Sequence, residues 1–137
     1  MTERPDETVL REHGVTPTAQ RVAVAGYVLH TQDHPAAEEV WTRVREGCPS
    51  LSRATVYNTL NLFVGKGLLR QVTLDGGRVV FDANTADHHH FIDDDTGAIF
   101  DLPWNALRVE RLSELGDFDV REYQVVLRGR RKTARPG

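Results

Sequence analysis

The stretch SRATVYNTLNLFVGKG, residues 52–67, predicts a helix with one apolar and one polar face. Ser52 can cap its N-terminus, and Gly65 and Gly67 mark its end. At about 100° per residue, one stripe collects the apolar side chains Val56, Leu60, Phe63 and Val64. The opposite side carries Ala54, Asn58 and Asn61, with Thr55 and Tyr57 at its edges. This outer face is small, polar and aromatic.

Such a face has the properties that recognition of the DNA major groove requires. Asparagine amides can bridge adenine, and hydroxyl groups can contact phosphates. Arg53 stands at the start of the helix, and further cations that can meet phosphates are Arg21, Arg70 and Arg78. Every amphipathic surface helix has a polar face, however, so this helix alone leaves DNA binding and simple solvent exposure open.

Two earlier helices and a later hairpin surround this stretch. The first helix is expected to begin at Pro17, capped by Thr16, and the second at Pro35. Their expected buried faces are Val22, Ala25, Gly26 and Leu29 in the first helix, and Ala37, Val40, Trp41 and Val44 in the second. Residues 68–74 and 78–82 are apolar and β-branched around Asp75-Gly76-Gly77, which predicts a hairpin. Helices followed by a hairpin indicate a winged helix-turn-helix.

The composition changes at residues 84–86, which we interpret as a hinge after a DNA-binding domain of residues 1–83. Residues 87–128 predict a strand, a turn, a second strand, a helix opening at Pro103 and a last strand over 120–127. This range is short for an independent core, so we expect it to dimerise. The basic tail 129–137 is expected to be disordered. The predicted class is α+β, an N-terminal winged helix-turn-helix followed by a small α/β dimerisation domain.

Histidines and aspartates gather just behind the expected hairpin. In an extended segment alternate side chains share a face, so His88 and His90 point together while Asp87 and His89 point the other way. The candidate metal ligands are His34, Asp82, His88, His90 and Asp101. Three imidazoles and two carboxylates suit Fe(II) or Mn(II), although zinc or cobalt can occupy the same ligands. A solvated polar strand is the alternative interpretation.

Composition excludes several classes of protein. No apolar run approaches the length of a membrane span, and the first residues have no apolar signal-peptide core, so we expect a cytoplasmic protein. Cys48 is the single cysteine, which excludes an intrachain disulfide and a zinc site built from paired cysteines. The net charge of −3 argues against indiscriminate binding of nucleic acids.

In these motifs the chain resembles the ferric uptake regulator family, from residues 16–21, TPTAQR, to Leu127. Residues 52–60, SRATVYNTL, resemble the recognition helix of that family, in which the position of Tyr57 contacts base methyl groups of AT-rich inverted repeats. Residues 34–38, HPAAE, and 87–91, DHHHF, resemble its regulatory metal motifs. The resemblance implies a homodimer that binds double-stranded DNA. The implied DNA contacts are Arg21, Ser52, Arg53, Thr55, Tyr57 and Asn58. The implied metal ligands are the same five residues.

Departures from the family pattern concern two other sites. Asp93 and Thr96 occupy positions of a CxxC pair and Arg131 lies near the second pair, so no structural zinc is expected. Arg108 and Tyr123 stand where a further metal site would need a carboxylate and a histidine. The chain is most similar to the iron response and peroxide regulator subgroups that lack the cysteine site. Haem is therefore an alternative ligand, with His88, His89, His90 and Cys48 as candidates, although Cys48-Pro49 can simply end the preceding helix.

The expected function is that of a metal- or haem-responsive repressor of iron homeostasis genes. One alternative is a peroxide sensor, in which bound Fe(II) oxidises a ligand histidine. A more distant alternative is a small metallohydrolase, which five protein ligands disfavour because an enzyme needs an open coordination position. A DNA-free interaction or metal-storage module would leave the winged segment without a use.

Overall fold

The computed structural model describes residues 5–132, and the chain divides into two compact units between Thr85 and Ala86. We describe each unit by itself. Residues 133–137 of the expected basic tail lie outside the described residues. Within the described range, no helix is long and apolar enough to cross a membrane.

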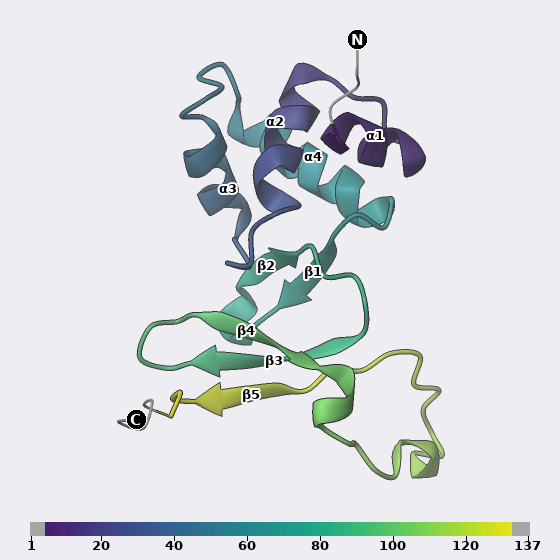
Figure 1. Cartoon of the computed structure of the whole chain (residues 1–137). Coiled ribbons are helices and arrows are strands. Elements are labelled where there is room, and N and C mark those ends of the chain that lie inside the picture. Colours follow the sequence, from purple (N-terminus) through teal and green to yellow (C-terminus); the bar gives the residue numbers. More distant parts are fainter. Residues whose placement is uncertain (1–4, 133–137) are drawn as a thin grey trace. The chain divides into compact units, whose positions relative to one another are not determined.

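The first unit consists of four α-helices and a two-stranded antiparallel hairpin (Figure 1). The elements are α1 (Pro5–Glu12), α2 (Ala19–Val28), α3 (Ala37–Val44), α4 (Arg53–Gly65), β1 (Arg70–Thr73) and β2 (Val79–Asp82). This order confirms the winged helix-turn-helix. The sequence did not predict α1, because Leu10 is its single buried residue and no apolar stripe marks it.

The start of α2 differs from the prediction at Thr16 and Pro17. Thr18 is the cap, and its hydroxyl accepts a hydrogen bond from the Arg21 amide at 3.2 Å. The buried residues of α2 are Val24, Ala25 and Val28. Gly26, expected in the core, is exposed, because Val24 and Val28, one turn apart, occupy the buried stripe.

The predicted boundaries of α3 and α4 are close to the observed ones. Ser52 caps α4 as predicted, and its Oγ accepts a hydrogen bond from the Thr55 amide at 3.1 Å. Val56, Leu60 and Phe63 are fully buried, together with Val24 and Val40 of the preceding helices. The core of the first unit therefore holds the inner face of α4 and leaves its outer face in solvent.

The hairpin is also as predicted. Strands β1 and β2 pair from Arg70 with Asp82 to Thr73 with Val79. Gly76 and Gly77 turn the chain with φ values of 75° and 79°. These left-handed values favour glycine, because a side chain there would clash with its own backbone.

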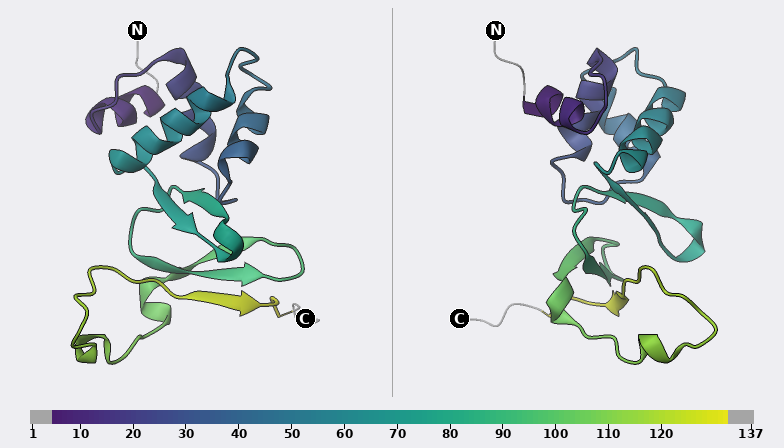
Figure 2. Two further views of the ribbon diagram at one scale, coloured as in Figure 1. Left: turned by 180° about the vertical axis from the view of Figure 1, so that it is seen from behind. Right: turned by 90° about the vertical axis from the view of Figure 1, so that its right-hand side faces the viewer.

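The second unit is built on a three-stranded sheet in the order β4-β3-β5 (Figures 1 and 2). Its strands are β3 (His88–Asp93), β4 (Ile99–Pro103) and β5 (Val126–Gly129). Strand β3 pairs antiparallel with β4 and parallel with β5, so His90 lies opposite Asp101 on one side and Val126 on the other. The histidine strand is thus the central strand of its sheet.

The helix predicted from Pro103 is wrong. The segment forms only two short 3₁₀ turns, η2 (Trp104–Ala106) and η3 (Leu112–Glu114), within a long connection that Figure 2 shows leaving the sheet. The last strand begins at Val126, not at Val120. A short helix needs tertiary packing to be stable. Here Leu115 and Phe118 are 46% and 73% exposed, so the spacing of leucines has no packing to support it.

Candidate metal ligands and DNA-binding face

In the first unit, His34 and Asp82 form a buried pair. His34 precedes α3 in a left-handed conformation with a φ of 52°, and Asp82 ends β2. The two are brought together because the Phe81 amide donates a hydrogen bond to the Pro35 carbonyl at 2.9 Å. The His34 Nε2 atom lies 3.2 Å from an oxygen of Asp82. A non-glycine residue with positive φ is uncommon, and such strain concentrates at functional sites.

The hydrogen bonds of His34 determine which of its nitrogens faces Asp82. Its Nδ1 lies 2.9 Å from the Gln32 carbonyl, and only an N–H can satisfy that contact. In the neutral ring, Nε2 therefore directs a lone pair toward the carboxylate. Two acceptors at this distance need a proton or a cation between them. A ring N–H that donates to a backbone carbonyl is the usual arrangement of a metal-binding histidine.

In the second unit, His88, His90 and Asp101 converge on one face of the sheet. The Nε2 atoms of the two histidines are 3.0 Å apart, and each lies 3.5 Å from the same Asp101 oxygen. The prediction that alternate histidines share a face is confirmed. The Nδ1 of His88 contacts the Ala86 carbonyl, so in the neutral ring the His88 Nε2, which faces the His90 Nε2, is the acceptor nitrogen.

The donor atoms of each unit fit a bound metal ion. Metal bonds of about 2.1 Å place neighbouring ligand atoms about 3.0 Å apart in an octahedron and about 3.4 Å apart in a tetrahedron. The observed separations span 3.0 to 3.5 Å. The His34–Asp82 pair and the His88–His90 pair are buried, whereas Asp101 is about a third exposed. Nitrogen and oxygen donors without sulfur are chemically suited to iron, manganese, zinc or cobalt.

His89 points away from this cluster, as predicted, and packs in an aromatic group instead. Its ring stacks on Trp104 with 4.5 Å between centroids, and Trp104 contacts Tyr123 at 4.7 Å. The His89 Nδ1 accepts a hydrogen bond from the Val125 amide at 3.0 Å, which anchors the start of β5. The sequence did not indicate this role, because the helix predicted to open at Pro103 would have included Trp104.

Oxygen atoms close the turn where the family resemblance places a cysteine pair. Asp93 accepts a hydrogen bond from the Asp95 amide at 2.8 Å, and the Thr96 hydroxyl accepts one from the Ala98 amide at 3.1 Å. Cys48, the single cysteine, lies elsewhere, between α3 and α4, and is partly buried against the core of the first unit.

The outer face of α4 presents Ala54, Tyr57, Asn58 and Asn61 to solvent. Tyr57 is 47% exposed, so its ring is accessible to a partner. The expected contacts Arg21, Thr55 and Asn58 line one hollow of about 280 Å³, together with Thr18, Gln20, Thr59 and Leu62. The sequence did not indicate that Gln20 lines this hollow, because its position near Asn58 depends on how α2 packs on α4.

The expected DNA contacts Ser52, Arg21 and Arg53 also make hydrogen bonds within the protein. Ser52 donates a hydrogen bond to the Thr55 hydroxyl at 2.9 Å. Arg21 donates one to the Thr16 carbonyl at 2.9 Å. Arg53 donates one from Nε to Glu38 at 3.0 Å. These side chains are held in place at the edges of the α4 outer face.

The comparisons with known proteins decide the family. The model of the ferric uptake regulator family matches residues 12–127. The chain belongs to the ferric uptake regulator family. The peroxide-responsive repressor PerR of Staphylococcus aureus is 34% identical over 88% of this chain and 82% of that protein.

Solved structures of the family share the fold. The Vibrio cholerae ferric uptake regulator superposes with a TM-score of 0.72 at 23% identity, covering 90% of this chain and 98% of that chain. The Pseudomonas aeruginosa ferric uptake regulator with manganese superposes with a TM-score of 0.69 at 27% identity, covering 95% and 100%.

Family membership settles the class of function. Proteins of the ferric uptake regulator family are metal-responsive DNA-binding regulators that bind DNA as dimers, and they are not enzymes. The metallohydrolase hypothesis is therefore wrong. A chain with one cysteine also cannot build a metal site from paired cysteines.

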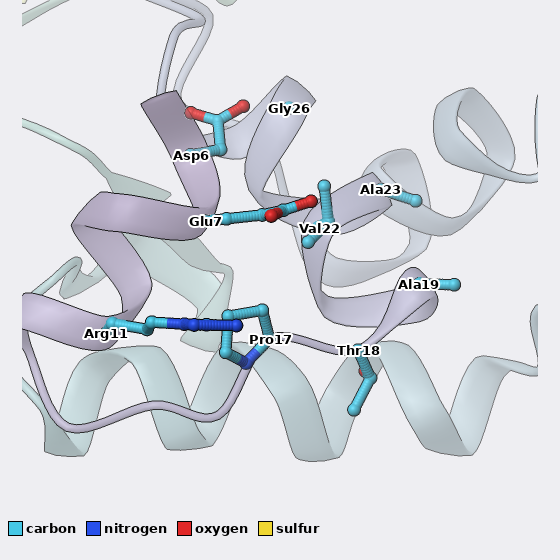
Figure 3. A pocket seen from close by; sticks show the side chains of 9 residues that line it. All are labelled: Asp6, Glu7, Arg11, Pro17, Thr18, Ala19, Val22, Ala23 and Gly26. Atoms are coloured by element: carbon cyan, nitrogen blue, oxygen red, sulfur yellow. The ribbon is translucent and has the colours of Figure 1, made fainter. Parts of the chain in front are cut away.

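A separate hollow of about 670 Å³ lies between α1 and α2 of the first unit (Figure 3). Figure 3 shows the Glu7 side chain extending toward Val22 and the Arg11 side chain toward Pro17. The α2 side of the hollow is formed by Val22 and the small residues Ala19, Ala23 and Gly26. Its lining contains neither a histidine nor a cysteine, and its acidic residues are Asp6 and Glu7.

Proposed function

We propose that this chain is a homodimeric repressor of iron homeostasis genes that binds AT-rich inverted repeats in response to Fe(II) or Mn(II). The metal would be held by His34, Asp82, His88, His90 and Asp101. The observation that carries this proposal is the pair of partial ligand sets. The His34 Nε2 lies 3.2 Å from an Asp82 oxygen, and the Nε2 atoms of His88 and His90 each lie 3.5 Å from one Asp101 oxygen. Iron and manganese both accept such nitrogen and oxygen ligands.

The two ligand sets belong to different units of the chain. The first unit supplies one imidazole and one carboxylate, and the second supplies two imidazoles and one carboxylate. Neither set alone fills the coordination sphere that Fe(II) or Mn(II) prefers. One ion bound by both sets would fix the angle between the units. In a dimer that angle sets the spacing of the two α4 helices, so the ion would favour one DNA-binding geometry over others.

Specific contacts to DNA would come from the α4 outer face. Tyr57 would meet thymine methyl groups, Asn58 would bond adenine, and Thr55 would contact phosphate. Arg21, Ser52 and Arg53 would meet phosphates at the edges of this face. The exposure of Tyr57 and Asn58 supports these roles.

The proposal is tested by fluorescence anisotropy of a labelled AT-rich inverted repeat at fixed salt, because phosphate contacts make affinity salt-dependent. Protein is titrated with chelator and then with Mn(II). We expect Mn(II) to change the DNA affinity of the wild type by at least about tenfold, a coupling of ordinary size. His88→Ala should lose this response. His13→Ala, which alters an exposed histidine at the end of α1, should keep it. A response retained in His88→Ala would show that the ligand assignment is wrong.

A peroxide sensor is the second candidate, and the 34% identity with the peroxide-responsive repressor of Staphylococcus aureus favours it. Bound Fe(II) would react with peroxide and oxidise a ligand imidazole, which destroys the site. We expect a gain of about 16 Da, one oxygen atom, on His34 or His88 after peroxide with Fe(II), and none with Mn(II). Peptide mass spectrometry measures this gain, and equal oxidation with both metals would exclude the mechanism.

Haem is a further candidate ligand, suggested by the resemblance to the iron response regulator subgroup. His88, His89, His90 and Cys48 would be the ligands considered. Release of DNA by haem, with a change in the haem absorption spectrum that Cys48→Ala alters, would favour this version. The Val125 amide bond to His89 argues for His88 or His90 as the histidine involved, because His89 is engaged in its aromatic group.

A further inference from the structure

Trp41 of α3 carries two guanidinium groups against its ring. The central carbon of Arg53 lies 4.2 Å from the ring centre and that of Arg45 lies 4.3 Å from it. The ring itself is fixed, because its Nε1–H donates a hydrogen bond to the Leu51 carbonyl at 3.0 Å. A partly buried indole thus holds cations from two segments, the end of α3 and the start of α4.

Glu38, one helical turn before Trp41, holds the same Arg53. The Nε and Nη2 atoms of Arg53 both lie 3.0 Å from one oxygen of Glu38. A guanidinium has five N–H donors, and this contact uses two of them. Arg53 is more than half exposed, so its other donors are accessible to a ligand from solvent.

The position of Arg53 relates this group to the outer face of α4. Arg53 and Tyr57 are one helical turn apart, so they are neighbours along the same edge of that face. Arg45 is exposed and shares the Trp41 ring with Arg53. Two cations with restricted side chains therefore border the outer face of α4 on its α3 side.

We propose that Arg45 is a phosphate contact of the DNA interface, beside Arg53, and that Trp41 is the positioning residue for both arginines. The inference rests on the proposed DNA-binding function and adds Arg45 and Trp41 to its interface. DNA phosphates are contacted mainly by arginine and lysine, and a flexible cation loses rotamer freedom when it binds. The Trp41 ring removes part of that loss before DNA arrives, because the guanidinium groups already stack on it.

A purely structural role of the stack, joining α3 to α4, makes a different prediction. Loss of a packing contact lowers stability but leaves the number of phosphate contacts unchanged. Loss of a phosphate contact lowers the dependence of DNA affinity on salt, because one counterion fewer is released. The slope of the logarithm of affinity against the logarithm of salt concentration therefore separates the two roles.

The test is anisotropy of a labelled AT-rich inverted repeat with full-length protein and Mn(II), measured over a series of salt concentrations. We expect Arg45→Gln to reduce the magnitude of the slope by about 0.9 and the affinity by about fivefold, the share of one phosphate contact. Arg43→Gln is the matched control, because Arg43 is exposed on the same helix but lies over Tyr27, 5.5 Å from its ring centre. It removes the same charge and should leave the slope unchanged.

Trp41→Leu tests the positioning role. We expect it to weaken DNA binding by about two- to tenfold at an unchanged slope, because the arginines still reach phosphate but lose more freedom on binding. Trp41→Phe keeps an aromatic ring and should restore most of the affinity. Circular dichroism establishes that each variant is folded. If Trp41→Leu does not fold, the Arg45→Gln and Arg43→Gln pair still decides the phosphate contact.

Three outcomes overturn the inference. A wild-type slope in Arg45→Gln, or an equal loss in Arg43→Gln, would remove Arg45 from the interface. Equal binding by Trp41→Phe and Trp41→Leu would remove the role of the aromatic ring. These results are distinct from failure of the proposed function, in which the wild-type protein itself would not bind the duplex under any metal condition.

Discussion

At the scale of single residues, backbone contacts select the chemistry of the histidines. His34 and His88 each use Nδ1 to bond a carbonyl two residues earlier in the chain, at Gln32 and Ala86. His89 uses Nδ1 as an acceptor for the Val125 amide. The same side chain therefore serves as a candidate metal ligand in two places and as a packing residue in the third.

Ser52 provides a stability prediction at this scale. Ser52→Ala removes the cap of α4, and we expect the free energy of unfolding to fall by about 1 kcal/mol. The cause is the Thr55 amide, which loses its acceptor at 3.1 Å. Urea unfolding measures the change. Ser50→Ala alters an exposed serine that is not a helix cap and should have almost no effect. Equal losses in the two variants would contradict the capping role.

At the scale of elements, the strength of the local pattern decides what sequence can predict. Helix α4 has a cap, an apolar stripe and terminal glycines, so its bounds are predictable from residues alone. The hairpin is predictable because Gly76 and Gly77 fit its left-handed turn. Helix α1 has only Leu10 buried, and so it left no clear signal.

The segment after Pro103 shows the opposite failure. The expected helix would have placed Leu107, Leu112 and Leu115 along its buried side, yet the chain forms only short 3₁₀ turns there. Arg111 adopts a left-handed φ of 69°, which a continuous helix does not allow. The spacing of apolar residues predicts which side chains would share a helix face. A short helix is stable, however, only when that face packs against another element.

At the scale of the whole molecule, the proposed metal would have ligands from both compact units of the chain. A ligand that binds only the folded protein stabilises it, by about 2.7 kcal/mol at a concentration one hundred times its dissociation constant. We expect Mn(II) to raise the melting temperature of the wild type, measured by circular dichroism. His34→Ala should lose most of this increase, because the first unit then keeps only Asp82 of its ligand pair. An unchanged increase in His34→Ala would place the metal in the second unit alone.

The candidate sites divide in the same way between local and tertiary information. Alternation along β3 predicted that His88 and His90 share a face, because a strand fixes the direction of successive side chains. Nothing in the sequence near Arg53 indicates that Glu38 and Trp41 hold it, since these residues belong to a different helix. The aromatic group of His89, Trp104 and Tyr123 was likewise missed, because its members meet only through the sheet and its long connection.

The sequence by itself determined the family, the order of helices and hairpin, the outer face of α4 and the pairing of alternate histidines. These depend on periodicity, capping and turn residues, which act over a few positions of the chain. Only the tertiary structure decided that 3₁₀ turns replace the helix expected after Pro103, which nitrogen of His34 faces Asp82 and which side chains hold Arg53. Those features depend on contacts between segments far apart in the chain, and such contacts form only when packing brings the segments together.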